Sequence, residues 1–376
     1  MLGSFKTRQN LEHPFRLFFL LAITGIIVAL MPWFSVSFAP QYAGHFPLHW
    51  HAFAFIELVG GAAFAGFLLT ALPSWCSYRP PLRYHSILLV LLLGVALICL
   101  PWPRLSSILI NGFWLYLLGL AARYIVHTRS WHHASFIGVV SAIAALSIAY
   151  SLNPQAKWLH ASVDVMIIGI ALANFRVGRV LGNQALEDSG IDDEQFIPNP
   201  FYKNISALLL MLAASLSLLA SEAVQGWLYL AVGMSFAARL QDWHDSRLLK
   251  RAYIRVYYAV SLSMAFGYMA LGLVLLTAPQ LFSFVRHFLA IAVYLLMVLT
   301  IMSIVGLRHS GLKLRFYFDT QLAMLLVVVA ALSRSVLVIY YPSLMTLYTI
   351  PSVALSLAFI IYIARYQAIF RHHEPR

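Results

Sequence analysis

The sequence predicts an all-α, polytopic transmembrane helical bundle with about 12 spans and both termini in the cytoplasm. Three observations predict it: the scarcity of charge, a series of apolar runs of membrane length, and basic residues in alternate loops. The chain of 376 residues is 61% hydrophobic and 10% charged, whereas soluble domains average about 25% charged residues. Lipid tails solvate such an excess of apolar side chains, so we expect one integral membrane domain, residues 1–376, in contact with the bilayer.

Apolar runs follow one another along the chain. They lie at about 16–38, 51–72, 86–101, 105–126, 134–151, 160–180, 204–220, 225–240, 254–276, 281–305, 320–340 and 345–368. Within each run the apolar residues are continuous rather than alternating, which favours helices over the strands of a β-barrel. The first run is long for the core of a signal peptide and lacks a convincing cleavage site, so we expect it to be retained.

The distribution of basic residues predicts the topology. The even-numbered loops contain most of the Lys and Arg, whereas the odd-numbered loops contain little beyond Arg104, Lys157 and Arg334. Because positive charge marks the cytoplasmic side, this alternation places both chain ends inside. The net charge of +12 is spread between the apolar runs and is not gathered in one basic patch. We therefore expect no nucleic-acid partner.

One longer loop divides the chain. Residues 181–203 contain five acidic side chains, whose spacing does not fit a calcium-binding loop. We interpret this loop as a solvated linker between two halves of the single domain. The halves are residues 1–180, with spans one to six, and residues 204–376, with spans seven to twelve.

Ionisable groups inside spans are the first candidates for function, because each one is costly in lipid and needs a partner or a role. The acids are Glu57 and Asp164, both assigned to the outer half of the membrane. The histidines assigned to the same depth are His49, His51, His160 and His287. His160 and Asp164 are four residues apart, so they share a helix face.

Two interpretations of this outer set stay open. One is a haem or metal site, with His51 and His287 as ligands and with His160, oriented by Asp164, beside them. The other is a set of interfacial histidines that cap helix starts and contact lipid headgroups. For a single histidine the second interpretation is the more common, and the shared depth of several favours the first.

A second set of histidines, including His13 and His309, is assigned to the cytoplasmic side. His287 and His309 are 22 residues apart, about 33 Å along a continuous helix. They therefore belong to different sites. Cys76 and Cys99 do not form the motif that attaches c-type haem, so any haem is expected to be held non-covalently.

Three stretches together resemble a known family. They are His13-Pro-Phe-Arg-Leu-Phe-Phe; then His49-Trp-His51 with Ala65-Gly-Phe-Leu-Leu-Thr-Ala-Leu-Pro-Ser-Trp75; and finally His287, Met297 and Met302 followed by Leu307-Arg-His-Ser-Gly-Leu-Lys313. The chain resembles the NnrS family, bacterial inner-membrane proteins of twelve predicted spans that are described as containing haem and copper. The family is linked to resistance against nitric oxide, and the Ala-Gly-Phe-Leu-Leu-Thr-Ala stretch is the most specific part of the resemblance.

The chain departs from the family pattern at several positions. The first motif commonly reads His-Ala-His-Glu-Met, and here Phe53 and Ala54 replace its second histidine and its glutamate. Ile304 occupies the position of an arginine that precedes the late motif. The resemblance carries His51, His287 and His309 over as site residues. The replacements put a copper site in question, so the resemblance implies b-type haem foremost.

Two positions for that haem stay open. We rank first the outer site, with His51, His287 and the neighbouring His49. The alternative is a site near the cytoplasmic face with His13 and His309 as the pair and Arg16 close by. Imidazole suits haem iron in either case.

The resemblance implies a multi-pass protein of the bacterial inner membrane that binds haem and protects against nitrosative stress. Its ligand would be nitric oxide or another diatomic molecule. No reaction is assigned, and the sequence does not fix the oligomeric state. One alternative is a secondary transporter in which Glu57 and Asp164 form a proton relay. Another is a nitric-oxide reductase or terminal-oxidase core, for which the required His-Pro-Glu-Val-Tyr stretch is missing.

Overall fold

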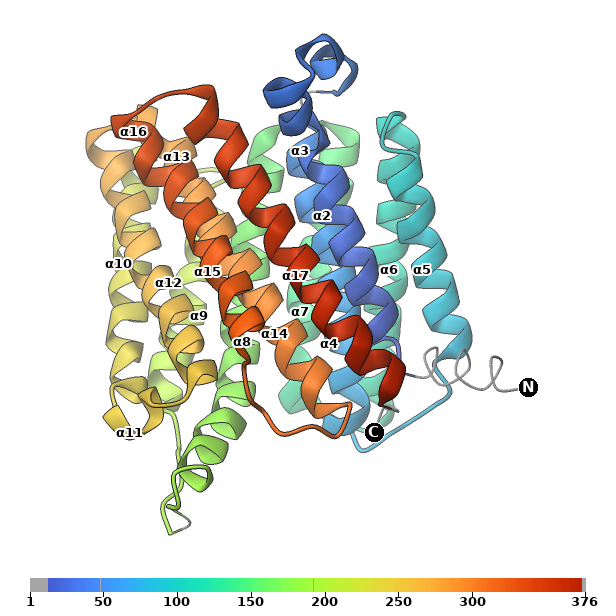
Figure 1. Ribbon diagram of the computed structural model, residues 1–376, viewed down its shortest axis with the longest axis vertical. Helices are drawn as coiled ribbons and strands as arrows, with labels where there is room; N and C mark the ends of the chain where they lie inside the picture. The colour runs from blue at the N-terminus through green and yellow to red at the C-terminus, as the bar shows by residue number, and fades with distance from the viewer. Residues whose placement is uncertain (1–12, 48, 192, 374–376) are drawn as a thin grey trace. The chain divides into compact units, whose positions relative to one another are not determined.

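The computed structural model describes residues 13–47, 49–191 and 193–373, and within these ranges the chain forms helices and no strands (Figure 1). The helices up to the acidic loop are α2 (Phe15–Phe38), α3 (Trp50–Phe53), α4 (Gly60–Trp75), α5 (Arg83–Ile98), α6 (Pro103–His127), α7 (Ala134–Leu152) and α8 (Ala156–Glu187). The all-helical fold class is thereby confirmed.

The helices after the acidic loop follow the same pattern. They are α9 (Pro200–Leu216), α10 (Glu222–Arg239), α11 (Ser246–Leu249), α12 (Ala252–Thr277), α13 (Phe282–Phe288), α14 (Leu296–Arg308), α15 (Phe318–Leu332), α16 (Val338–Tyr340) and α17 (Ile350–His372). Short 3₁₀ turns connect several of them: η1 (Pro40–His45), η3 (Trp131–His133), η4 (Leu240–Trp243) and η5 (Pro279–Leu281).

Nine helical segments of the described residues are long and apolar enough to cross a membrane. They are Phe15–Phe38, Trp50–Trp75, Pro103–His127, Trp131–Leu152, Ala156–Glu187, Ala252–Thr277, Pro279–Arg308, Phe318–Tyr340 and Met345–His372. The helices α5 and α9 have only 16 and 17 residues, fewer than the roughly 20 that span a bilayer without distortion. The chain is thus a multi-pass membrane protein, while the number of about 12 spans and the side of the termini stay predictions.

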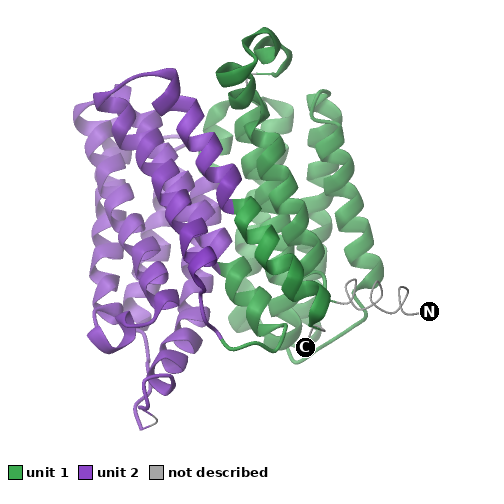
Figure 2. Ribbon diagram, viewed as in Figure 1, with its two compact units in different colours: residues 1–162, 301–313, 359–376 green, residues 163–300, 314–358 purple. Residues whose placement is uncertain are grey.

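The described chain divides into two compact units (Figure 2). Unit 1 comprises residues 1–162, 301–313 and 359–376, and unit 2 comprises residues 163–300 and 314–358. The first boundary falls inside α8 rather than in the acidic loop. The organisation into halves 1–180 and 204–376 stays a prediction.

Unit 1 is built around the packing of α2 against α4 and of α6 against α4, α5 and α7. Gly66 in α4 allows the first of these contacts. A Cβ at this position would lie 2.8 Å from the ring of Phe19 and 3.1 Å from Phe18 Cβ. Small residues of this kind let membrane helices approach closely. The glycine of the Ala-Gly-Phe-Leu-Leu-Thr-Ala stretch is therefore a packing residue.

In unit 2 the close pair is α10 with α12. A Cβ on Gly233 would lie 2.5 Å from the backbone nitrogen of Met269 and 2.8 Å from the carbonyl oxygen of Ala265. Since a backbone cannot move aside as a flexible side chain can, only glycine permits this approach.

Four π-helical turns interrupt the long helices. They are η2 (Ala54–Val59), η6 (Leu289–Leu295), η7 (Ser333–Leu337) and η8 (Met345–Thr349). The turn η2 begins shortly after His51, and η6 begins shortly after His287. Such turns occur frequently at functional sites, so these two mark the neighbourhoods of both predicted outer ligands.

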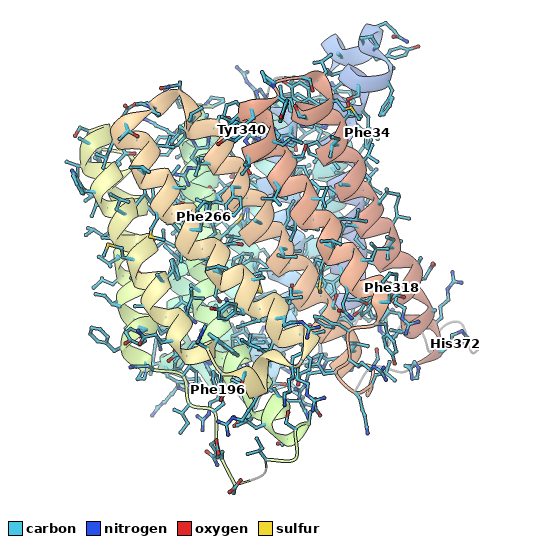
Figure 3. The ribbon with its side chains drawn as sticks, turned by 60° about the vertical axis from the view of Figure 1, so that its left-hand side comes forward. Phe34, Phe196, Phe266, Phe318, Tyr340 and His372 are labelled. Carbon is cyan, nitrogen blue, oxygen red and sulfur yellow. The ribbon has the colours of Figure 1, made fainter. Side chains whose placement is uncertain are left out.

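Large apolar side chains remain exposed along the helices. Phe266, in the middle of α12, and Phe318, at the start of α15, are 54% and 79% exposed (Figure 3). Exposed aromatic and aliphatic side chains on this scale would be unfavourable in water. They suit a surface that faces lipid.

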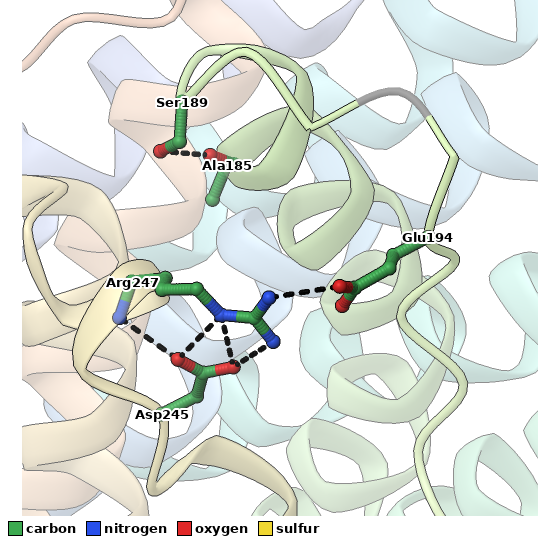
Figure 4. Close-up of polar contacts among 5 residues, drawn as sticks. All are labelled: Ala185, Ser189, Glu194, Asp245 and Arg247. Atoms are coloured by element: carbon green, nitrogen blue, oxygen red, sulfur yellow. Dashed lines mark hydrogen bonds and ion pairs between the residues drawn. The ribbon is translucent and has the colours of Figure 1, made fainter.

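An ion pair links the acidic loop to α11 in unit 2. Arg247 donates to Asp245 at 2.8 Å and to Glu194 at 3.0 Å (Figure 4). The Asp245 side chain also accepts from the backbone nitrogen of Arg247 and so caps α11. Arg247 holds the pKa of the Asp245 carboxyl below its ordinary value, first through its side-chain hydrogen bonds.

Candidate functional site

His51 lies on α3 in unit 1, and two groups approach its Nδ1 atom. Trp33 Nε1 donates to Nδ1 at 2.7 Å, and the carbonyl oxygen of Ala29 lies 3.1 Å from the same nitrogen. Because Nδ1 cannot accept and donate at once, the two contacts correspond to two tautomers. Donation to Ala29 is the tautomer of a metal-binding histidine, since it places the lone pair on Nε2.

His287 lies on α13 in unit 2, half-buried. Its Nδ1 lies 2.7 Å from the carbonyl oxygen of Ser283, one turn earlier. A carbonyl only accepts, so Nδ1 carries the proton and Nε2 carries the lone pair. The ring is thus in the form that a ligand requires. His51 and His287 belong to different units, and their role as a pair stays a prediction.

Asp164 is the centre of a buried charged cluster in unit 2. Its side chain is 0% exposed, and its two oxygens accept from Arg286 Nη1 at 2.6 Å and Nη2 at 2.9 Å. Tyr229 and Tyr268 donate to the same oxygens at 2.8 and 2.9 Å. The carboxylate therefore has a full charge partner and four donors, which is what a charge in lipid needs.

This cluster bears on the predicted role of Asp164 in a proton relay. An ion pair with two donors on each oxygen leaves the carboxylate little capacity to move protons as part of a relay. The predicted orientation of His160 by Asp164 stays a prediction. Arg286 was missed by sequence reasoning, because one arginine in the run 281–305 is outweighed by its apolar neighbours.

Glu57 lies on η2 in unit 1, 0% exposed. Trp114 Nε1 donates to its Oε2 at 2.7 Å. Its Oε1 has no hydrogen-bond partner within the part of the chain that the structure describes. The two intramembrane acids therefore differ: Asp164 is paired with a cation, and Glu57 keeps one oxygen unsatisfied.

A pocket with two histidines in its wall lies at the end of unit 1 where α2 begins and α4 ends. We call it the terminal pocket, and its volume is about 470 Å³. It is lined by His13, Pro14, Leu69, Thr70, Pro73, Ser74, Arg79, Pro80, Pro81, Leu82 and His309. The structure thus brings together the two histidines of the predicted inner pair.

The terminal pocket also joins the three stretches that carry the family resemblance. His13 and Pro14 come from the first stretch and His309 from the last. Leu69, Thr70, Pro73 and Ser74 come from the second stretch, on the last turns of α4. Stretches far apart in the sequence therefore form one wall, which is typical of a binding site.

Arg16 lies beside this pocket but is engaged elsewhere. Its guanidinium donates to the carbonyl oxygens of Phe370 at 2.8 Å and His373 at 2.7 Å, at the end of α17. It also contacts the ring of Phe370. The predicted role of Arg16 as a cofactor-binding residue stays a prediction, and Arg79 is the basic side chain in the pocket wall.

His49 and the replaced positions Phe53 and Ala54 lie at the other end of unit 1, whereas Ile304 lies on α14, five residues before His309. The His49 ring lies 6.2 Å from that of Tyr150, and Phe53 stacks on the same tyrosine at 5.6 Å. Ala54 and Ile304 are buried apolar residues. Across residues 13–47, 49–191 and 193–373, no three His, Cys, Asp or Glu side chains are grouped to hold a metal ion.

Comparison with known families decides the relationship. The model of the NnrS family, described as NnrS protein, matches residues 9–373. The chain belongs to the NnrS family. Searches of curated proteins and of solved structures found no match to the chain. Parts of all three stretches that carry the resemblance line the terminal pocket of this NnrS-family protein. The terminal pocket is therefore the first candidate for its functional site.

Proposed function

We propose that this NnrS-family protein binds b-type haem in the terminal pocket, with His13 and His309 as the iron ligands. One observation carries the proposal: two imidazoles, each from a stretch that resembles the family, line the same pocket of about 470 Å³. Pockets for cofactors usually measure about 300–1,000 Å³. The rest of the wall combines apolar residues, which can contact a porphyrin ring, with the polar side chains Thr70, Ser74 and Arg79.

The residues present fit the group. Imidazole nitrogen is a common axial ligand of haem iron, and the guanidinium of Arg79 can pair with a propionate. Leu69, Pro73 and Leu82 offer apolar contact to the ring. Haem would supply an iron centre that binds nitric oxide or another diatomic ligand. We propose on this basis that the protein acts in resistance to nitrosative stress in the bacterial inner membrane.

The outer site remains the competing position for haem. His287 has the tautomer of a ligand, and His51 can adopt it. We place the terminal pocket first because its two histidines line one pocket within one unit.

Haem content of purified variants tests the proposal. His13→Ala and His309→Ala are each expected to lose most of the Soret absorbance, and Arg79→Gln to bind haem more weakly. The matched control is His372→Ala, an exposed histidine at the end of α17. Addition of nitric oxide to the wild-type protein is expected to shift the Soret band.

Two results would contradict the proposal. A wild-type protein without a Soret band, even after haem is supplied, would exclude haem binding altogether. Loss of haem in His51→Ala and His287→Ala, with haem retained in His13→Ala and His309→Ala, would move the cofactor to the outer site. Growth of a deletion strain under nitric oxide, with and without each variant, tests the physiological part.

A further inference from the structure

Glu57 belongs to a buried polar cluster of unit 1 that the haem proposal does not use. Trp114 on α6 donates to Glu57 Oε2. On α7, the Ser147 hydroxyl donates to Asn111 Oδ1 at 2.9 Å and interacts with the Glu57 carboxyl group. Tyr150, one turn further along α7, interacts electrostatically with the same group. Three side chains thus interact with one carboxyl group, and Asn111 joins them through Ser147.

Two oxygens of this cluster are unsatisfied. Glu57 Oε1 and the Tyr150 hydroxyl are both buried, and neither has a hydrogen-bond partner among the described residues. They are therefore not bonded to each other, although the two groups interact. Buried polar atoms without a protein partner are usually served by a water molecule or an ion.

Among the residues that the structure describes, no cationic side chain forms a hydrogen bond or an ion pair with Glu57. The elements packed on η2 are α2, α3, α4 and α5, and α6 and α7 supply Trp114 and Tyr150. The ionisable side chains of these elements other than Tyr150 are Arg16, His49, His51, Arg83, Tyr84, His85, Arg104, Tyr116, Arg123, Tyr124 and His127. The charged ones lie at helix ends, away from the Glu57 carboxyl group.

A carboxylate without a counter-charge is strongly disfavoured away from water. Glu57 therefore holds a proton in its resting state. Asp164, in contrast, is ionised, because Arg286 balances its charge.

A small cavity gives access to the cluster. It measures about 10 Å³, roughly the volume that one water molecule needs. Its polar wall is formed by His49, Ser106, Ser107 and Tyr150. Tyr150 thus lines the cavity and also interacts electrostatically with the carboxyl group of Glu57.

We propose that Glu57 is an intramembrane proton-binding site, loaded from this cavity through the hydroxyl of Tyr150. A hydronium ion in the cavity gives a proton to the Tyr150 oxygen, and Tyr150 passes its own proton through a bridging water to Glu57 Oε1 when that carboxyl group is ionised. The hydronium ion loses one O–H bond and Glu57 gains one, while the oxygens of Tyr150 and of the bridging water each lose one and gain one. Atoms and charge balance, and no electron changes hands. Asn111 and Ser147 keep the site polar without supplying charge.

Infrared spectroscopy of the purified protein in detergent tests this proposal. The wild type is expected to show the carbonyl stretch of a protonated carboxylic acid at neutral pH, and Glu57→Gln is expected to lose it. Glu222→Gln, which changes an exposed acid at the start of α10, serves as the control and is expected to keep the band. Trp114→Phe removes the hydrogen-bond donor to Glu57 Oε2 and is expected to shift the same band. This shift would assign the band to Glu57 in a protein that still contains the glutamate.

The route is tested by exchange into heavy water. Tyr150→Phe is expected to slow the deuterium shift of the Glu57 band by about a hundredfold, the usual contribution of a positioned proton-transfer group. A band that persists in Glu57→Gln would overturn the site. An unchanged exchange rate in Tyr150→Phe would overturn the route, and loss of the band on adding sodium would show a metal cation instead of a proton.

Discussion

Replacement of Asp164 by Asn should strongly destabilise unit 2. Asp164 and Arg286 are buried, at 0% and 7% exposure, and the carboxylate accepts four hydrogen bonds. An amide oxygen in its place can keep two of these, and its NH₂ group would face donors. Two lost charge-assisted bonds at about 1.5–3 kcal/mol each give about 3–6 kcal/mol.

A second estimate agrees with the first. Breaking a buried ion pair by removing one partner costs about 3–5 kcal/mol in soluble proteins, because the other charge is left unpaired. Hydrogen bonds between helices in membranes contribute only about 0.6 kcal/mol on average. That average does not include the cost of leaving a buried charge without its partner. We therefore expect about 3 kcal/mol or more, roughly a 100-fold rise in the unfolding constant.

Reversible unfolding in mixed micelles measures this loss. Asp164→Asn and Arg286→Met should each be destabilised, whereas the double replacement Asp164→Leu with Arg286→Met should recover most of the stability, since no charge is left buried. A single variant that loses less than about 1 kcal/mol would refute the reasoning, because that is the worth of an exposed pair. So would a double variant whose loss equals the sum of the two single losses.

Two further predictions concern packing and pH. Gly66→Ala should lower the thermal unfolding temperature, because overpacking against Phe19 costs about 1–3 kcal/mol. Gly94→Ala is the control, since a Cβ at Gly94 meets nothing within 4 Å, and it should be neutral or slightly stabilising. Equal effects of the two replacements would contradict the packing argument. Arg247 lowers the pKa of the Asp245 carboxyl in the folded protein. The stabilisation of α11 by the Asp245 cap should therefore be fully present above about pH 3.9, the pKa of Asp in an unfolded chain. It should be lost as the pH falls through the lower pKa that Asp245 has in the folded protein. Hydrogen exchange of residues 246–249 measures it, and Asp245→Asn should remove the pH dependence.

The sequence predicts the helices well. Continuous apolar runs predict the long helices, most of them to within a few residues, because hydrophobicity averages over a whole span. The exception is α8, which continues to Glu187 and so extends beyond the run 160–180 into the segment expected to be a loop. The same averaging hides Arg286. Arg334, expected in a loop, lies within η7. Arg239 is the last residue of α10 and donates to the carbonyl oxygen of Ala171.

The site was harder to predict, because it depends on contacts between distant stretches. The sequence offered His13 with His309 as one of two pairs, and only packing shows that both line one pocket. Similarly, Glu57 and Asp164 look alike in the sequence as single acids in apolar runs. Their difference is set by Arg286, which lies more than a hundred residues from Asp164. The π-helical turns have no local pattern by which they could be found.

The hydrogen bonds of Arg16 to the carbonyl oxygens of Phe370 and His373 have a consequence for biosynthesis. The helix α2 leaves the ribosome early, and the acceptor carbonyl of Phe370 follows 354 residues after Arg16. Until α17 has been made, Arg16 has no access to these two carbonyl oxygens. The terminal pocket has its complete wall once His309, which directly follows α14, has been made. Under the proposed function, haem binding therefore follows the synthesis of α14, and the contacts of Arg16 with α17 close this end of unit 1 afterwards.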